Sequence, residues 1–192
     1  MKKILCSVAL SLSMAFTTSA AIAEDIGLSP QEVYELKTGG GKEPIFFVDV
    51  RDPVEIMFVG STDVVDDNIP FMLVDRYEVD EAKGVFRMYR NPHFVNEIKS
   101  ALRERGLAED TMVVTMCRSG SERGEPSADV LREAGLNAYY VVNGFQGSAI
   151  KEGEKAGFRT QNGWQNSGLP WSPKMNAEKA YRTPKAESLP TY

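Results

Sequence analysis

The sequence predicts an α/β domain with an open, mainly parallel central sheet flanked by helices. Short apolar segments rich in β-branched and aromatic residues alternate along the chain with longer amphipathic segments, a pattern typical of strands joined by helices. The segment 45–51, Ile-Phe-Phe-Val-Asp-Val-Arg, is almost continuously apolar, as expected of a central strand buried on both faces. Ligands bind at the carboxyl ends of the strands in such sheets, so we expect the functional site there.

The predicted elements have recognisable boundaries. The strands of the sheet are predicted at residues 45–51, 68–71, 113–116 and 138–142. Helices are predicted from Pro30 to just before Gly39, at 91–105 and at 127–134. Ser29 is the expected N-cap of the first helix, with Glu32 three residues later to complete a capping box. Gly106 and Gly135 are expected to end the other two helices.

A β-hairpin is predicted between the second strand and the second helix. The segments 72–79 and 85–89 flank residues 80–84, a short connection that ends in glycine. We expect this hairpin to be an excursion from the sheet, and a role as a lid over the site is the alternative.

The end of the chain is expected to pack on the domain only as far as Trp171. Trp164, Leu169 and Trp171 are the apolar residues that would anchor it. From Ser172 onward, prolines, lysines and small polar residues leave too little apolar surface to bury. We therefore predict one domain over residues 24–171 and a disordered tail over 172–192.

Residues 1–23 are predicted to be a secretory signal peptide. Lys2 and Lys3 precede an apolar run at 4–16, and Ala21-Ile22-Ala23 supplies a small-x-small cleavage site. The run is shorter than the roughly 18 residues that a membrane-spanning helix needs. We expect a mature chain that starts near Glu24, lies in a bacterial periplasm and keeps no membrane segment.

Composition excludes several classes of function. The chain has 22 Lys and Arg against 27 Asp and Glu, so its net charge of −5 does not favour nucleic acid as a partner. The sequence has no repeats, no Walker or dinucleotide fingerprint and no cluster of metal ligands, so we expect no cofactor and no metal. Of the two cysteines, Cys6 lies in the signal segment, which leaves Cys117 without a disulfide partner in an exported protein.

Cys117 is the predicted nucleophile. It follows the 113–116 strand and precedes a helix, in the sequence Cys117-Arg118-Ser119-Gly120-Ser121-Glu122-Arg123. The thiolate is the reactive form of cysteine, and helix N-termini and neighbouring arginines favour it. Gly120 permits the loop conformation in which successive backbone N–H groups converge on an anion. The loop is therefore predicted to bind an anionic substrate through residues 118–123, and the alternative is that Cys117 is a buried core residue.

Three other polar residues are candidates for catalysis. Asp49 and Arg51 end the predicted 45–51 strand, where we expect them to brace the strand end through hydrogen bonds and an ion pair; contact with the substrate is the alternative. His93, the only histidine, lies in the first turn of a predicted helix. We expect it to be a surface residue and not a general base.

These motifs together resemble the rhodanese family. The resemblance rests on Val48-Asp49-Val50-Arg51 followed by Glu55, on Asn68-Ile69-Pro70, on Cys117-Arg118-Ser119-Gly120 and on Asn143-Gly144-Phe145, in that order. It covers about residues 28–171. The resemblance implies a compact α/β domain and transfer of sulfane sulfur from thiosulfate or a related donor through a persulfide on Cys117.

One feature departs from the rhodanese pattern. The usual loop has six residues and often ends in Arg or Thr, whereas here Glu122 holds that position and Arg123 comes one residue later. Cysteine, five residues and then arginine is similar to the dual-specificity cell-cycle phosphatases built on the same fold. A wider loop would suit a tetrahedral phosphate or arsenate, which Arg123 could bind through two oxygens. Against this hypothesis, Met116 stands where those phosphatases have histidine.

The prediction is therefore an exported sulfurtransferase that moves sulfane sulfur from a small anionic donor to a thiol or cyanide by way of Cys117. A cysteine-dependent phosphatase or arsenate reductase with the same nucleophile is the first alternative. A non-catalytic sulfur carrier or protein-binding module is the second.

Overall fold

The computed structural model describes residues 26–40 and 43–182, so the predicted signal peptide lies outside the described residues. Within them, a five-stranded sheet runs in the order β1-β7-β6-β2-β3, and each neighbouring pair is parallel. The strands are β1 (Gly27–Leu28), β2 (Ile45–Asp49), β3 (Asp67–Asn68), β6 (Met112–Met116) and β7 (Ala138–Val141). This arrangement confirms the predicted α/β class and its parallel sheet.

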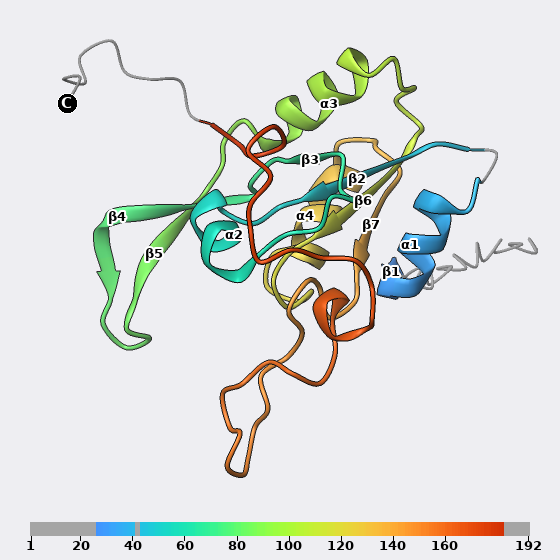
Figure 1. The fold of residues 1–192 in the computed structure, drawn as a ribbon. Coiled ribbons are helices and arrows are strands. Elements are labelled where there is room, and N and C mark those ends of the chain that lie inside the picture. Colours follow the sequence, from blue (N-terminus) through green and yellow to red (C-terminus); the bar gives the residue numbers. More distant parts are fainter. Residues whose placement is uncertain (1–25, 41–42, 183–192) are drawn as a thin grey trace, which may run out of the picture.

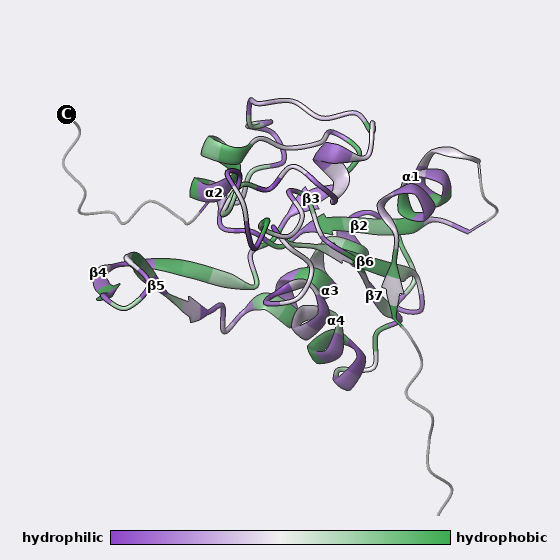
Figure 2. Ribbon diagram, turned by 90° about the horizontal axis from the view of Figure 1, so that it is seen from below, coloured by the Kyte–Doolittle hydropathy of each residue, from purple (hydrophilic) through white to green (hydrophobic). Residues whose placement is uncertain are grey.

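Helices cover both faces of the sheet. They are α1 (Pro30–Thr38), α2 (Pro53–Val59), α3 (Phe94–Glu104) and α4 (Gly124–Glu133). Figure 2 shows α3 and α4 together on one side of the sheet, with α1 and α2 on the other. Because successive strand residues point to opposite faces, Phe46 packs into the core beneath α3 and α4, while Phe47 packs with Val33 of α1. Apolar burial on both faces explains why β2 is buried at every position.

The helix ends follow the predicted caps, but two helices start elsewhere than predicted: α3 begins at Phe94 and not at Asn91, and α4 also differs. Ser29 and Glu32 form the expected capping box at the start of α1. Helix α4 begins at Gly124, three residues before the predicted start at Ser127. Pro126 does not prevent this, because the backbone N–H groups of a first turn need no partner within the helix. Only six residues, 118–123, therefore lie between Cys117 and the first helical residue.

The predicted hairpin is present and extends away from the sheet (Figure 1). It consists of β4 (Met72–Asp80) and β5 (Val85–Arg90), which pair antiparallel with an irregularity between Val74 and Val79. Asp52 joins its base to α2: one carboxylate oxygen accepts from Val54 N–H at 2.8 Å and the other from Val74 N–H at 2.9 Å. The base of the hairpin is thus fixed beside the N-terminus of α2.

Two of the three predicted anchors near the end of the chain pack on the domain. Trp164, in the 3₁₀ turn η1 (Trp164–Asn166), is fully buried, and its ring centroid lies 5.3 Å from that of Phe47. Leu169 packs against the same core cluster. Trp171 makes an edge contact with Phe145 and stays 41% exposed.

The prediction of a disordered tail from Ser172 onward is wrong for residues 172–182. Ser172 pairs with Ser61 through two backbone hydrogen bonds of 2.9 and 2.8 Å. Farther along, Lys179 O accepts from Asn68 N–H of the edge strand β3, and Tyr181 donates to Glu97 of α3. Composition did not predict this ordered strap, because backbone and side-chain hydrogen bonds to distant parts of the chain hold it in place. The rest of the predicted tail, 183–192, lies outside the described residues.

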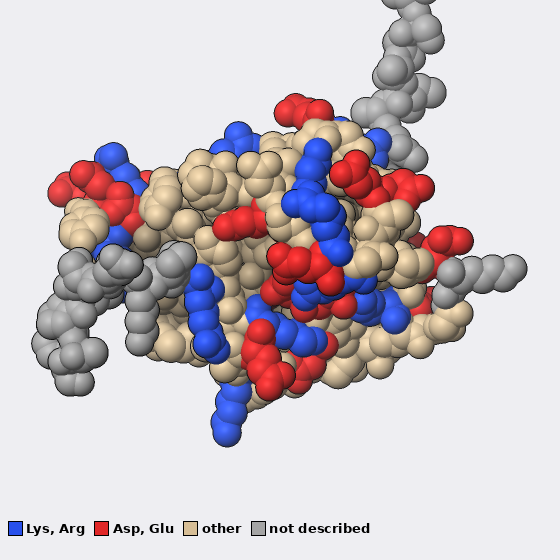
Figure 3. Space-filling view, turned by 90° about the horizontal axis from the view of Figure 1, so that it is seen from above, with Lys and Arg blue, Asp and Glu red and all other residues tan. Residues whose placement is uncertain are grey.

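The surface carries both signs of charge. On the face shown in Figure 3, Lys and Arg side chains are intermixed with Asp and Glu. Among the described helices, none combines the length and the apolar character needed to cross a membrane.

Candidate active site

The predicted nucleophile lies between the carboxyl end of β6 and the N-terminus of α4. Cys117 is fully buried, and its Sγ accepts a hydrogen bond of 3.1 Å from Gly120 N–H. A Cβ placed on Gly124, the first residue of α4, would lie 3.5 Å from the same sulfur. The sulfur therefore contacts a loop amide and the start of a helix, and both favour negative charge on it.

A turn at residues 143–147 supports the cysteine loop through backbone hydrogen bonds. Phe145 N–H donates to Cys117 O at 2.8 Å, and Gln146 N–H donates to Arg118 O at 2.8 Å. Gly144 has φ +54°, and a Cβ there would come within 2.3 Å of Cys117 O. Only glycine permits so close an approach of the two backbones. The Asn-Gly-Phe motif is thus the support on which the cysteine loop rests.

Two buried hydroxyl groups fix the start of α4. Thr115 Oγ1 and Ser127 Oγ both donate to Gly124 O, at 3.0 and 2.7 Å. Thr115 belongs to β6, so the bond ties the first turn of the helix directly to the strand that carries Cys117. This limits the freedom of the loop between them.

Arg123, the last residue of the loop, is engaged by Glu55 of α2. Its two terminal nitrogens bind the two oxygens of Glu55, with Nη2–Oε2 at 2.8 Å. Burial alone would lower the pKa of Arg123, but the hydrogen bonds and charge of Glu55 outweigh it and raise the pKa. Burial would likewise raise the pKa of Glu55, and Arg123 outweighs it and lowers the pKa. Both groups are therefore charged, and the fork of Arg123 is already occupied.

Asp49 and Arg51 form a second buried ion pair. Arg51 donates to Asp49 through Nε and Nη2, and also from Nη2 to Gly60 O at 3.0 Å. Its guanidinium carbon lies 4.2 Å from the centroid of the Phe145 ring, while Nη1 has no hydrogen-bond partner within the described chain. Asn68 donates to the carbonyl groups of both residues, Asp49 O and Arg51 O. This is the bracing arrangement that the sequence predicted.

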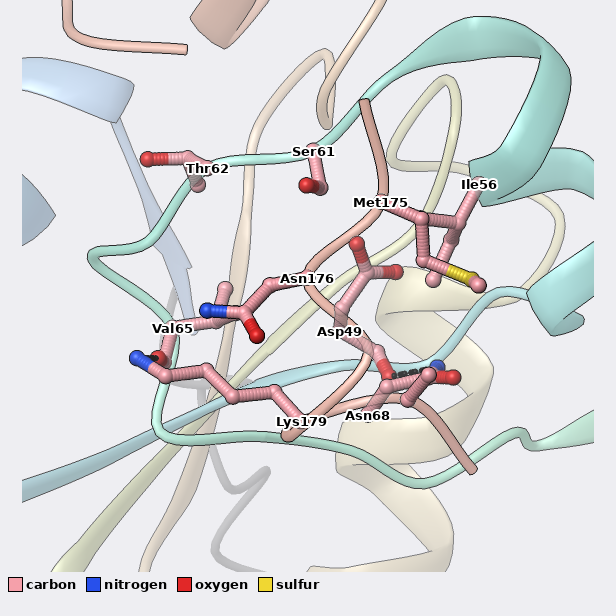
Figure 4. A pocket seen from close by; sticks show the side chains of 10 residues that line it. Asp49, Ile56, Ser61, Thr62, Val65, Asn68, Met175, Asn176 and Lys179 are labelled. Atoms are coloured by element: carbon pink, nitrogen blue, oxygen red, sulfur yellow. Dashed lines mark hydrogen bonds between the residues drawn. The ribbon is translucent and has the colours of Figure 1, made fainter. Parts of the chain in front are cut away.

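The carboxyl group of Asp49 also lines a small cavity beneath the C-terminal strap (Figure 4). Asn176 and Lys179 of the strap and Ser61 border it on the other sides. Its volume of about 10 Å³ is enough for about one water molecule. The cavity is too small for a substrate, and Asp49 is 1% exposed, so a structural role for Asp49 explains its position.

The other predicted loop residues differ in exposure. Gly120 is buried with φ +89°, and Ser119 is half-buried. Ser121 and Glu122 are exposed. His93, at the N-cap of α3, is exposed and makes no side-chain cap bond, as expected of a surface residue. Among the described residues, no three His, Cys, Asp or Glu side chains are grouped so as to hold a metal ion.

Within the described part of the chain, the side chain of Arg118 contacts the 143–147 turn and not an acidic residue. Its Nε donates to Gln146 Oε1 at 2.8 Å, and the side chain is half-buried. Burial and then the positive charge of Arg159 lower the pKa of Arg118. Arg159 comes from the loop at 148–162, between the supporting turn and η1, and donates to Gly147 O.

Sequence reasoning missed the partners of these arginines. The Arg123–Glu55 pair joins positions 68 residues apart, so no local pattern reveals it. One signal was present: Asp52-Pro53 is a typical helix start, with an N-cap and a proline at the first position. Recognising it places Glu55 in the first turn of a helix that follows the central strand. For Gln146 and Arg159 we find no sequence signal.

The parallel sheet has the order β1-β7-β6-β2-β3, and a cysteine lies at the carboxyl end of its middle strand, in a loop that leads into a helix. This arrangement is a rhodanese-like fold. Among solved structures, Rv0390 from M. tuberculosis is similar, with 28% identity and a TM-score of 0.54 over 77% of this chain and 96% of that one. A rhodanese-related protein from Thermoplasma volcanium aligns over 77% of this chain and 98% of that one, at 20% identity and a TM-score of 0.43. Neither the protein-family models nor the curated proteins include a match.

Proposed function

We propose that this protein is a sulfurtransferase that carries sulfane sulfur on Cys117. The observation that supports this best is the hydrogen bond from Gly120 N–H to Sγ inside a closed loop at the start of α4. A loop amide that already contacts the sulfur can stabilise the negative charge of a thiolate and of a persulfide. The exposed position of His93 agrees with a mechanism that uses no histidine base.

The reaction would proceed in two displacements. The thiolate of Cys117 attacks the outer sulfur of thiosulfate; a new S–S bond forms, the old one breaks, and sulfite leaves with the electron pair. The product is a persulfide on Cys117. Cyanide or a thiolate then attacks the outer sulfur and takes it, and Cys117 leaves as the thiolate. Sulfur and charge balance in both steps, and no metal or cofactor takes part.

The geometry at Arg123 favours sulfur over phosphate chemistry. A cysteine-dependent phosphatase or arsenate reductase would need the guanidinium fork of Arg123 for two oxygens of its substrate. Here Glu55 occupies that fork, and its carboxylate would lose its main partner if a substrate displaced it. Met116, where the phosphatases have histidine, is fully buried in the core. The phosphatase hypothesis therefore requires a rearrangement that sulfur transfer does not.

The test is the intact mass of the purified protein after thiosulfate treatment, and again after cyanide is added. We expect a gain of one sulfur atom on Cys117, lost to cyanide as thiocyanate appears. Cys117→Ser is the matched control and should gain nothing. If the wild type gains no sulfur, sulfur transfer is refuted, and phosphate esters and arsenate become the substrates to test. A persulfide that forms but passes to neither cyanide nor thiols would indicate the sulfur-carrier alternative.

We also propose that the protein is exported to a periplasm, on the strength of the signal-like residues 1–23. Export would leave Cys117 as the only cysteine, free of any internal disulfide. The N-terminal sequence of the protein from the periplasmic fraction of its host should begin near Glu24. A cytoplasmic protein that retains Met1 would contradict export without bearing on the chemistry of Cys117.

A further inference from the structure

Two arginines beside the cysteine loop lack an acidic partner. Within residues 26–40 and 43–182, no ion pair within 4.0 Å involves Arg118 or Arg159. The other two arginines of the site differ, because Arg51 is bound by Asp49 and Arg123 by Glu55. The positive charge of the first two is thus not compensated by a contacting carboxylate.

The two guanidinium groups are held on consecutive residues of one turn. Arg118 binds the side chain of Gln146, and Arg159 binds the carbonyl of Gly147. The turn is itself tied to the cysteine loop, since the N–H groups of Gln146 and Gly147 both donate to Arg118 O, at 2.8 and 3.2 Å. Arg118 directly follows Cys117 in the chain. The pair is therefore attached to the backbone of the cysteine loop and to the turn that contacts it.

The 148–162 loop is built so that Arg159 keeps this position. Asn166 Nδ2 donates to three carbonyl oxygens, those of Gln146, Arg159 and Asn162. Asn162 Oδ1 accepts from Ser148 N–H at 2.8 Å, which closes the base of the loop. Both ends of the loop are thus fixed, and the backbone of Arg159 is held by Asn166, which belongs to the same 3₁₀ turn as the buried Trp164.

Holding two like charges together costs free energy that an anion would recover. The cost is visible in Arg118, whose pKa is lowered by burial and by the charge of Arg159. Each guanidinium uses one N–H in the hydrogen bonds described, so several donors of each remain for a ligand. A carboxylate or sulfonate accepts such paired donors well.

We propose that Arg118 and Arg159 form a subsite for a carboxylate or sulfonate group on the compound that reacts at Cys117. Arg159 is then a specificity-determining residue that selects anionic sulfur compounds over neutral ones of the same reactivity. The sulfur-compound part of this statement depends on the proposed function, whereas the anion subsite itself does not.

The first experiment avoids sulfur transfer. Iodoacetate and iodoacetamide alkylate a thiolate by the same displacement of iodide, but only iodoacetate carries a carboxylate. The ratio of their rate constants at Cys117, followed in the peptide that contains it, therefore measures the preference for an anion. A unit charge about 6 Å from a carboxylate in water changes a rate by about threefold. We expect Arg159→Gln to lower the ratio by at least about threefold and Arg159→Lys to retain most of it.

The matched control is Lys155→Gln, which removes one charge from an exposed position of the same loop and should leave the ratio unchanged. The ratio in the wild type should also fall as salt is raised from about 20 to about 500 mM, because screening weakens the attraction. An equal ratio in Arg159→Gln and the wild type would overturn the subsite. Failure of both reagents to reach Cys117 would overturn it as well.

The second experiment identifies which reactant carries the anion. Persulfide on Cys117 is discharged with 3-mercaptopropionate or 2-mercaptoethanol, which differ in the carboxylate. If the acceptor carries the anion, Arg159→Gln should raise the KM for 3-mercaptopropionate but not that for 2-mercaptoethanol. If the donor carries it, Arg159→Gln should slow only the transfer of sulfur from thiosulfate to Cys117. Sulfur loading without any effect of Arg159 refutes the subsite alone. An altered alkylation ratio without sulfur loading refutes the proposed function alone.

Discussion

Replacing Glu55 by glutamine should destabilise the protein by about 2–3 kcal/mol at neutral pH. The change keeps the shape of the side chain but removes the charge that Arg123 contacts. Arg123 is buried, with 8% of its side chain exposed, so solvent cannot replace the lost partner. A glutamine oxygen still accepts one hydrogen bond, which is why the loss should be smaller than for alanine.

The magnitude follows from the geometry of the pair. With Nη2–Oε2 at 2.8 Å, the charge centres lie about 4 Å apart, which at an effective dielectric constant of about 20 corresponds to about 4 kcal/mol of attraction. Breaking a buried pair by removing one partner costs about 3–5 kcal/mol. The Glu55 side chain is 22% exposed, so the expected value lies below that range.

The effect should depend on pH in one direction. The folded state lowers the pKa of Glu55 through Arg123, against the opposing effect of burial. A carboxylate with a lowered pKa stabilises the fold above its unfolded pKa of about 4.3, and this contribution is lost as pH falls through the lower folded value. The stability difference between the wild type and Glu55→Gln should be constant from about pH 6 to 8 and shrink below about pH 4.

Urea unfolding of both proteins across this pH range measures the difference. Arg123→Gln and the double variant complete a thermodynamic cycle, in which a favourable coupling free energy is expected. A difference that stays the same down to about pH 3 would refute the reasoning, because the charge of Glu55 would then not be its source. A coupling near zero would show that the two side chains act independently.

Three further predictions concern the fold. Gly144→Ala should cost more than about 3 kcal/mol or abolish folding, because its Cβ would lie 2.3 Å from Cys117 O at φ +54°; a melting temperature within a few degrees of the wild type would contradict this. Burial and Glu97 raise the pKa of Tyr181 to about 12. The free energy of unfolding of the wild type should therefore fall by up to about 1 kcal/mol relative to that of Tyr181→Phe between pH 10 and 12. Identical alkaline unfolding of the two proteins would show that the phenol contributes nothing. Asp66→Asn should lower the free energy of unfolding, measured in urea, by about 1–2 kcal/mol, because the carboxylate of Asp66 accepts from both Lys37 and a backbone N–H of β2. Unchanged stability would mean that solvent replaces both hydrogen bonds.

Much of the fold could be predicted because its signals are local. The capping box at Ser29 and the continuous apolar run of β2 depend on residues a few positions apart. Helix α2 was missed because it has seven residues and buries only Ile56 among its helical positions, so it shows no amphipathic period. The two-residue strand β1 is too short to show any period, and β3 is Asp67–Asn68, which overlaps the predicted 68–71 strand only at Asn68. The ordered strap at 172–182 depends on tertiary hydrogen bonds, which composition does not contain.

The candidate site also has parts that the sequence predicts and parts that it does not. The cysteine, its glycine and its position between strand and helix could be predicted from one stretch of sequence. Its supports come from elsewhere in the chain: Gly144 lies beneath the loop, and Glu55 lies across it on α2. The spacing of Cys117 and Arg123 indicated an arginine free to bind phosphate. In the structure Glu55 binds that arginine, and only the folded chain brings the two residues together.

The four arginines of the site differ in how their charge is balanced, and this bears on the choice between sulfur and phosphate. Asp49 and Glu55 hold Arg51 and Arg123, so a substrate that took the fork of Arg123 would leave a partly buried carboxylate without its main partner. A single sulfur atom added to Cys117 makes no such demand, because it does not require the fork of Arg123, and Gly120 N–H already contacts the sulfur of Cys117. An anion that stays outside the loop can instead use the unpaired charge of Arg118. Persulfide chemistry is therefore compatible with every ion pair of the site as it stands, whereas phosphate binding must first break one.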